Sequence, residues 1–148
     1  MLPQQRQAFL KSGNSSGGLN NKQFRRVGDS PLIGAGTYAG SQCAVSCTGA
    51  GENFIKEVAA HSVSAMMKWG GATLAEACDE VIYGTPATEG GVSGGLVAMD
   101  ASGAVVYPFN SAAMYRGKLD SSDGGKCTTL IWREEHDSHR EIYEQPIH

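Results

Sequence analysis

The chain is organised around two neighbouring stretches, residues 26–39 (Arg26-Val-Gly-Asp-Ser-Pro-Leu-Ile-Gly-Ala-Gly-Thr-Tyr-Ala39) and residues 44–51 (Ala44-Val-Ser-Cys-Thr-Gly-Ala-Gly51). In the first stretch, Arg26 and Asp29 are three residues apart, with a glycine between them and Ser-Pro after them. This pattern is typical of a turn, because glycine permits positive φ and proline fixes its own φ. The turn predicts that the guanidinium and the carboxylate point into one cleft.

The second stretch predicts a strand that ends at a ligand. Its apolar run stops abruptly at Cys-Thr-Gly-Ala-Gly, where a hydroxyl and the backbone of small residues are open. A cation, a carboxylate, a hydroxyl and glycine N–H groups together suit a zwitterionic amino-acid substrate. On spacing alone, Arg26 and Asp29 could instead form a local salt bridge that closes a surface turn. Thr48 could likewise be an ordinary residue at a strand end.

Composition excludes several classes of protein. The 148 residues, 41% of them hydrophobic, are enough for one domain with a buried core. The net charge of −3 argues against a nucleic acid or an anionic membrane as partner. No apolar run approaches the roughly 20 residues of a membrane span. Residues 1–10 lack the apolar centre of a signal peptide, which favours a cytoplasmic location.

The four cysteines, Cys43, Cys47, Cys78 and Cys127, have no paired C-x-x-C spacing. Cys43 and Cys47 alternate with apolar residues, which favours small buried hydrophobes over metal ligands or a disulfide. No metal site and no cofactor are expected.

Hydrophobic periodicity predicts strands, then two helices, then strands. A buried strand is expected over 43–47 and a helix over 52–69, followed by a second helix that opens with the capping box Thr73-Leu-Ala-Glu76. Residues 95–109 predict a β-hairpin. Residues 111–125 are expected to be a loop and residues 127–133 a last strand. This order predicts an α+β fold with mostly antiparallel strands.

Several sequence blocks resemble one family. They are residues 16–22 (Ser-Gly-Gly-Leu-Asn-Asn-Lys), 26–39, 45–52, 94–100 (Gly-Gly-Leu-Val-Ala-Met-Asp), 108–110 (Pro-Phe-Asn) and 114–116 (Met-Tyr-Arg). In this order they resemble the plant-type L-asparaginase/isoaspartyl peptidase family of N-terminal-nucleophile hydrolases. The resemblance implies half of an αββα sandwich. It divides the chain into an unmatched segment 1–13, a β-subunit-like domain 14–133 and a charged tail 134–148.

The resemblance also implies residue roles in substrate binding. Arg26 would hold the α-carboxylate of the substrate through its planar fork. Asp29 would hold the α-ammonium, and the Gly51 backbone would contact the same amino group. The expected substrate is L-asparagine or a β-aspartyl (isoaspartyl) dipeptide.

The implied catalytic residues are Thr48, Gly49 and Ser16. The Thr48 hydroxyl and the Gly49 N–H would form the oxyanion hole. Ser16 lies where the family usually has a threonine that orients the nucleophile. The nucleophile itself is the N-terminal Thr of the family's β-subunit, whose own α-amino group acts as base. None of the residues before Asn14 is a threonine.

Three functions from different classes therefore stay open. The first is the β-subunit part of an amidohydrolase, inactive alone and completed by an α-subunit or a second copy. The second is a truncated, non-catalytic relative that keeps the amino-acid pocket or serves as an interaction partner. The third is an unrelated small-molecule or nucleotide-binding module.

Overall fold

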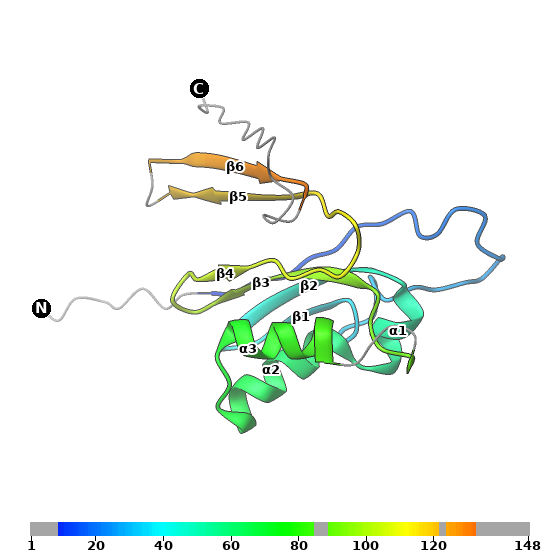
Figure 1. The fold of residues 1–148 in the computed structure, drawn as a ribbon, viewed down its shortest axis with the longest axis horizontal. Helices are drawn as coiled ribbons and strands as arrows, with labels where there is room; N and C mark the ends of the chain where they lie inside the picture. The colour runs from blue at the N-terminus through cyan, green and yellow to red at the C-terminus, as the bar shows by residue number, and fades with distance from the viewer. Residues whose placement is uncertain (1–8, 85–88, 122–123, 133–148) are drawn as a thin grey trace, which may run out of the picture. The chain divides into compact units, whose positions relative to one another are not determined.

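The computed structural model describes residues 9–84, 89–121 and 124–132. The chain divides into two compact units, Met1–Asn110 and Ser111–His148. Each unit is described by itself below, and Figure 1 shows the course of the chain.

The first unit is built on a four-stranded sheet in the order β1-β2-β3-β4. Its strands are β1 (Thr37–Ala39), β2 (Cys43–Gly49), β3 (Gly94–Asp100) and β4 (Val105–Val106). All neighbours pair antiparallel, and the longest register runs from Cys43 opposite Asp100 to Gly49 opposite Gly94. The predicted strand over 43–47 and the predicted hairpin are therefore confirmed, although β4 is only two residues long.

Helices cover one face of this sheet (Figure 1). They are α1 (Gly51–Lys56), α2 (Ala59–Gly70) and α3 (Leu74–Asp79), and α3 continues as a π-helical turn over Glu80–Gly84. The capping box before α3 is confirmed: Thr73 accepts the Glu76 N–H, and the Thr73 N–H donates to the Glu76 carboxylate at 2.9 Å.

The prediction of one continuous helix over 52–69 is wrong. The helix breaks at Val58, whose backbone has φ 49°, and α2 starts anew at Ala59. The reason is tertiary: the Ala60 N–H donates to the Ala35 carbonyl at 3.0 Å, and the His61 N–H donates to the Gly34 carbonyl at 2.8 Å. These bonds satisfy N–H groups that a helix start leaves without an intrahelical partner.

The core lies between the sheet and the helices. Alternate residues of β2, namely Cys43, Val45 and Cys47, point to the helical side and pack with Phe54 and the other core residues. Both cysteines are free and buried, as expected of small hydrophobes. The observed mixture of helices and antiparallel strands confirms the α+β class.

The second unit contains a two-stranded antiparallel sheet of β5 (Arg116–Asp120) and β6 (Lys126–Leu130). The prediction of a loop over 111–125 is wrong for residues 116–120, because Arg116 pairs with Leu130 and Asp120 with Lys126. The sequence of β5, Arg-Gly-Lys-Leu-Asp, has one apolar residue, so no hydrophobic alternation marks it as a strand. The predicted tail 134–148 lies outside the described residues.

In the described part of the chain, no helix is long and apolar enough to cross a membrane.

Candidate active site

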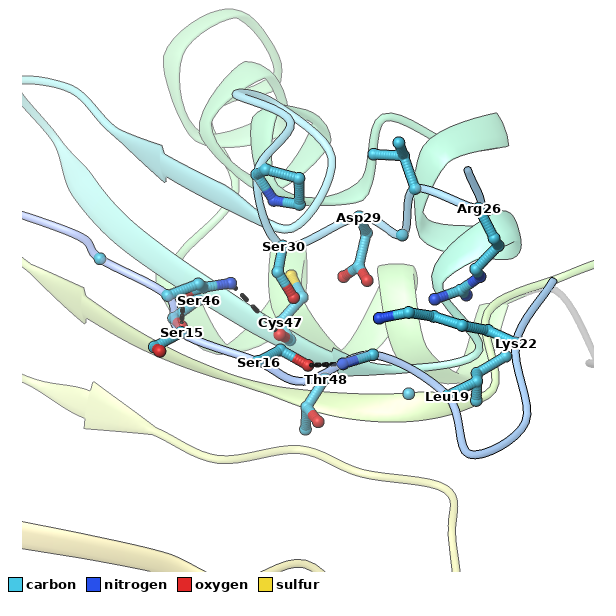
Figure 2. Close-up of a pocket in the computed structure, with 17 residues that line it drawn as sticks. Ser15, Ser16, Leu19, Lys22, Arg26, Asp29, Ser30, Ser46, Cys47 and Thr48 are labelled. Atoms are coloured by element: carbon cyan, nitrogen blue, oxygen red, sulfur yellow. Dashed lines mark hydrogen bonds between the residues drawn. The ribbon is translucent and has the colours of Figure 1, made fainter. Parts of the chain in front are cut away.

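A cleft of about 750 Å³ opens in the first unit, at the end of β2. Its walls come from the segment 13–31 and from the last residues of β2, Ser46 to Gly49. Five of the six residues that the sequence singled out line this one cleft: Ser16, Arg26, Asp29, Thr48 and Gly49. Figure 2 shows Arg26, Lys22 and Asp29 extending toward the same part of the cleft, with Thr48 on the strand below them and its side chain directed away from them. The fold thus brings residues 33 positions apart in the sequence into one site.

Asp29 is held by a compact turn. Its carbonyl oxygen accepts the Leu32 N–H at 2.9 Å and the Gly36 N–H at 3.2 Å, so the chain folds back directly after it. The side chain is only 5% exposed, and no described group donates a hydrogen bond to Oδ2. Burial raises the pKa of this carboxyl, although the nearby Arg26 cation opposes the rise. An under-partnered buried carboxylate is costly unless a ligand or ion supplies the missing contact.

Gly51 does not line the cleft, but it determines where Asp29 lies. A Cβ on Gly51 would come within 2.7 Å of Asp29 Oδ1 and 2.9 Å of the Asp29 backbone nitrogen. Gly36 stands on the other side, where a Cβ would be 2.7 Å from Oδ2. The carboxylate therefore fits between two glycines that leave room for nothing larger.

Arg26 is paired, but with a residue other than Asp29. Its Nε donates to Glu52 Oε1 at 2.8 Å and its Nη2 donates to Glu52 Oε2 at 2.9 Å. No ion pair between Arg26 and Asp29 occurs among the described residues, so the alternative of a local salt bridge within the turn is wrong. Arg26 Nη1 makes no described hydrogen bond and lies beside Gly28, which lines the cleft.

The strand end supplies a hydroxyl and an unusual backbone. Thr48 is exposed at the cleft, and Gly49 follows it with φ 144°. A Cβ on Gly49 would be only 2.2 Å from the Ser93 carbonyl oxygen, because β3 passes close by. Only glycine fits this position, for both its backbone conformation and its close contact.

Ser16 lies in the loop that faces β2. Its hydroxyl oxygen accepts the Gly18 N–H at 3.0 Å, which shapes a tight local turn. The preceding Asn14 fastens this loop to the sheet, because its amide donates to the Gly36 carbonyl at 2.7 Å and its oxygen accepts from the Ser46 hydroxyl.

Sequence reasoning assigned no role to three residues at the site: Asn14, Lys22 and Glu52. Lys22 lines the cleft and donates from its ammonium to the Gly17 carbonyl. Lys22 and Glu52 both occur inside the sequence blocks quoted above. Only their contacts across the fold, 26 residues apart for Arg26 and Glu52, reveal what they touch.

The cleft offers charged side chains, hydroxyls and backbone groups to a ligand. The described residues contain no cluster of three or more His, Cys, Asp or Glu side chains placed to hold a metal ion. The described residues that line the cleft also include no histidine. Charge and backbone dipoles, rather than an imidazole, are what these residues offer to a ligand.

By fold and site, the chain belongs to the α+β proteins that carry a polar, charged cleft at the end of a central antiparallel strand. The model of the asparaginase family matches residues 4–129, and the chain is a member of this family. The resemblance drawn from the sequence blocks is therefore confirmed. The match begins inside the segment 1–13 that the motifs left unmatched.

The chain is similar in sequence to isoaspartyl peptidases and L-asparaginases from several organisms. The chain is 48% identical over 130 residues to the isoaspartyl peptidase of Escherichia coli (strain K12), covering 87% of this chain and 40% of that protein. It is 48% identical over 121 residues to a probable isoaspartyl peptidase/L-asparaginase 2 of Arabidopsis thaliana, covering 82% and 36%. It is 36% identical over 122 residues to a plant-type L-asparaginase of Thermococcus kodakarensis, covering 77% and 38%. The chain thus spans about two-fifths of the length of these relatives.

Proposed function

We propose that the chain forms the substrate-binding and oxyanion part of an amidohydrolase that cleaves the side-chain amide of L-asparagine or a β-aspartyl (isoaspartyl) peptide. One observation carries the proposal. Asp29 is a buried carboxylate with an oxygen that lacks a described partner, and it lies in the same cleft as the cationic Arg26. The two charges match the α-ammonium and the α-carboxylate of an amino acid.

Each end of the amino acid has its own reason to bind. An α-ammonium beside Asp29 would supply the hydrogen bonds that Oδ2 lacks, and the pairing would recover part of the cost of burying the carboxylate. An α-carboxylate beside Arg26 would accept charge-assisted hydrogen bonds from the nitrogens that Glu52 leaves free. A ligand with both groups therefore binds better than one with either group alone.

The reacting amide would lie near the end of β2. There the Thr48 hydroxyl and the Gly49 N–H would donate to the oxygen that gains negative charge during attack. The nucleophile is proposed to be an N-terminal Thr of the family type, activated by its own α-amino group. Ser16 would help to orient this residue from the facing loop. Water then releases aspartate from the acyl-enzyme.

The remainder of the active unit is proposed to come from an α-subunit or from a second copy of the chain, with the nucleophilic Thr outside these 148 residues. The support is the coverage of only 36–40% of the relatives above. The non-catalytic alternative shares the same cleft and would bind the same ligands without cleaving them.

The test is calorimetric titration with three matched ligands. L-Aspartate carries both groups, β-alanine is L-aspartate without its α-carboxylate, and succinate is L-aspartate without its α-ammonium. Arg26→Ala should lower the affinity for L-aspartate about 10-fold or more and leave the affinity for β-alanine unchanged. Asp29→Asn should lower the affinity for L-aspartate and leave the affinity for succinate unchanged.

Two charged residues outside the cleft serve as controls. Arg25→Ala and Asp79→Asn remove exposed side chains that do not line the cleft. Neither should change the affinity for any of the three ligands. If L-aspartate binds the Arg26 and Asp29 variants as tightly as the unaltered protein, this assignment of the cleft is wrong.

A further inference from the structure

We propose that Glu52 is a positioning residue for substrate recognition. It accepts hydrogen bonds from Arg26 outside the cleft and so orients the free edge of the guanidinium toward the substrate α-carboxylate. This inference rests on the proposed function and extends it to a residue with no direct contact to the substrate. It predicts a selective effect of Glu52 on ligands that carry an α-carboxylate.

The contact uses one edge of the guanidinium and leaves another. An arginine side chain offers five N–H donors in a rigid plane. Glu52 takes the side edge, through Nε at 2.8 Å and Nη2 at 2.9 Å. The end edge, formed by Nη1 and the second hydrogen of Nη2, makes no described hydrogen bond. One planar cation can therefore hold two carboxylates at once, Glu52 on the side edge and a ligand on the end edge.

Two neighbouring glycines leave room for the guanidinium. A Cβ on Gly28 would be 2.8 Å from Nη1, and a Cβ on Gly51 would be 3.2 Å from Nη2. The Arg26 side chain is 16% exposed, compared with 53% for Glu52. Arg26 is thus the inner member of the pair, and its guanidinium lies in space that a Cβ on either glycine would take.

Glu52 lies where it can orient Arg26 without competing with a ligand for the cleft. Arg26 lines the main cleft, whereas Glu52 lines only a neighbouring depression, together with Arg26 and the segment 22–25. The Glu52 carboxylate therefore does not occupy the place of a ligand in the cleft. It contacts the Arg26 guanidinium on the side away from the cleft.

The charge of Glu52 persists under working conditions. The hydrogen bonds from Arg26 lower the pKa of Glu52 to about 2, so the ion pair remains intact at any pH near neutrality. Without this partner, Arg26 would have to be ordered when the ligand binds, and ordering a long side chain costs affinity.

The experiment compares Glu52→Gln with Glu57→Gln in the purified full-length protein. Glu57 is an exposed glutamate that follows α1 and does not line the cleft, so its variant makes the same change of charge elsewhere. Glu52→Gln should lower the affinity for L-aspartate about 3- to 10-fold and leave the affinity for β-alanine unchanged. Glu57→Gln should change neither affinity. For L-asparagine turnover, KM should rise by more than kcat falls, because uniform binding is what is lost.

A double-mutant cycle isolates the coupling. If Glu52 acts through Arg26, Glu52→Gln added to Arg26→Ala should weaken L-aspartate no further. Glu52→Asp keeps the charge but is one methylene shorter, so it should give an intermediate loss; it also serves if Glu52→Gln fails to fold.

The outcomes are distinct. If Arg26→Ala weakens L-aspartate but Glu52→Gln and Glu52→Asp do not, the positioning role is wrong and the proposed function stands. Tighter L-aspartate binding by Glu52→Gln would show that Glu52 competes with the ligand for Arg26, and would overturn the inference. Equal losses for L-aspartate and β-alanine would show a merely structural role. No effect of Arg26→Ala would reject the proposed role of Arg26, and the inference with it.

Discussion

At the scale of single residues, the buried carboxylate of Asp29 should lower the stability of the unliganded protein. Its carboxylate is buried between Gly36 and Gly51, in a space that excludes any Cβ. Backbone N–H groups of Asp29 and Ser30 and the Arg26 cation only partly offset the desolvation of this charge, so the unliganded protein carries the rest of the cost. The same residue should therefore have opposite effects on stability and on binding.

Asp29→Asn should stabilise the unliganded protein at pH 7 by about 1 kcal/mol, because it removes a desolvated charge at constant shape. The folded-state pKa of Asp29 is raised, so between its ordinary value and the raised value the folded state binds more protons than the unfolded state. The Asp29-dependent part of the stability therefore falls as pH rises through this range. The advantage of Asp29→Asn should be present at pH 7, shrink as pH falls through the raised pKa toward the ordinary value, and be small below about 4.

Thermal unfolding at both pH values measures this effect. Added L-aspartate should raise the melting temperature of the unaltered protein but not that of the variant. A variant that is less stable at pH 7 than the unaltered protein would contradict the prediction.

Gly51→Ala should destabilise the protein by about 1–3 kcal/mol, because its Cβ would overlap Asp29 Oδ1 at 2.7 Å and the Asp29 backbone. It should also weaken L-aspartate, since Asp29 must move. Gly70→Ala is the matched control: a Cβ there meets nothing within 4 Å, and the alanine should stabilise α2 by up to about 0.5–1 kcal/mol. Denaturant unfolding compares the two variants, and equal effects would show that the steric argument is wrong.

At the scale of the elements, the junction between α1 and α2 carries strain. Val58 is β-branched and has φ 49°, a left-handed conformation that costs L-residues roughly 1–2 kcal/mol. The junction persists because the loop carbonyls of Gly34 and Ala35 accept the N–H groups of His61 and Ala60. The loop thus sets where α2 begins.

Val58→Gly should therefore stabilise the protein by about 1 kcal/mol, since glycine adopts positive φ without steric cost. Ala65→Gly, in the middle of α2, should destabilise it by about 1 kcal/mol, because the same residue is unfavourable where φ is helical. Denaturant midpoints of the two variants test the pair. Destabilisation of similar size in both would mean that the Val58 side chain contributes more by packing than its backbone costs.

These elements also show what the sequence alone could predict. The capping box at Thr73 and the apolar run of β2 are local signals, so both were predictable. The break at Val58 was not, because it depends on hydrogen bonds to a loop more than twenty residues earlier. The members of the cleft were named from sequence blocks, but the partner of Arg26 was not. Glu52 fits the start of a helix as well as it fits a guanidinium, and only the fold distinguishes the two.

At the scale of the whole molecule, binding and bond cleavage have separate structural requirements. The described residues supply the charges, the Thr48 hydroxyl and the Gly49 backbone at one cleft. His61 lies elsewhere, packed against Tyr38 and Trp69 with ring centroids 5.1 and 6.1 Å away. It is therefore not placed to take a proton from a hydroxyl in the cleft.

The 148-residue polypeptide, expressed by itself from Met1 to His148, should bind L-aspartate without hydrolysing L-asparagine. In the proposed mechanism one threonine supplies both the hydroxyl and the amine base, and neither Thr48 nor Ser16 has a free α-amino group. An oxyanion hole alone contributes roughly 10²–10³-fold per donor, far below the ~10⁶-fold or more of an enzyme. The full-length protein, with whatever precedes or follows these residues, is the positive control.

Aspartate release from L-asparagine and from β-aspartyl-leucine measures this directly. The polypeptide should release no aspartate above the uncatalysed background, while calorimetry still detects L-aspartate binding that Arg26→Ala weakens. Turnover on the order of one per second, lost in Thr48→Ala, would mean that a residue of this polypeptide is itself the nucleophile. Such a result would reject the mechanism proposed here but not the assignment of the cleft, because the proposed recognition of the amino acid by Arg26 and Asp29 does not depend on which group attacks its amide.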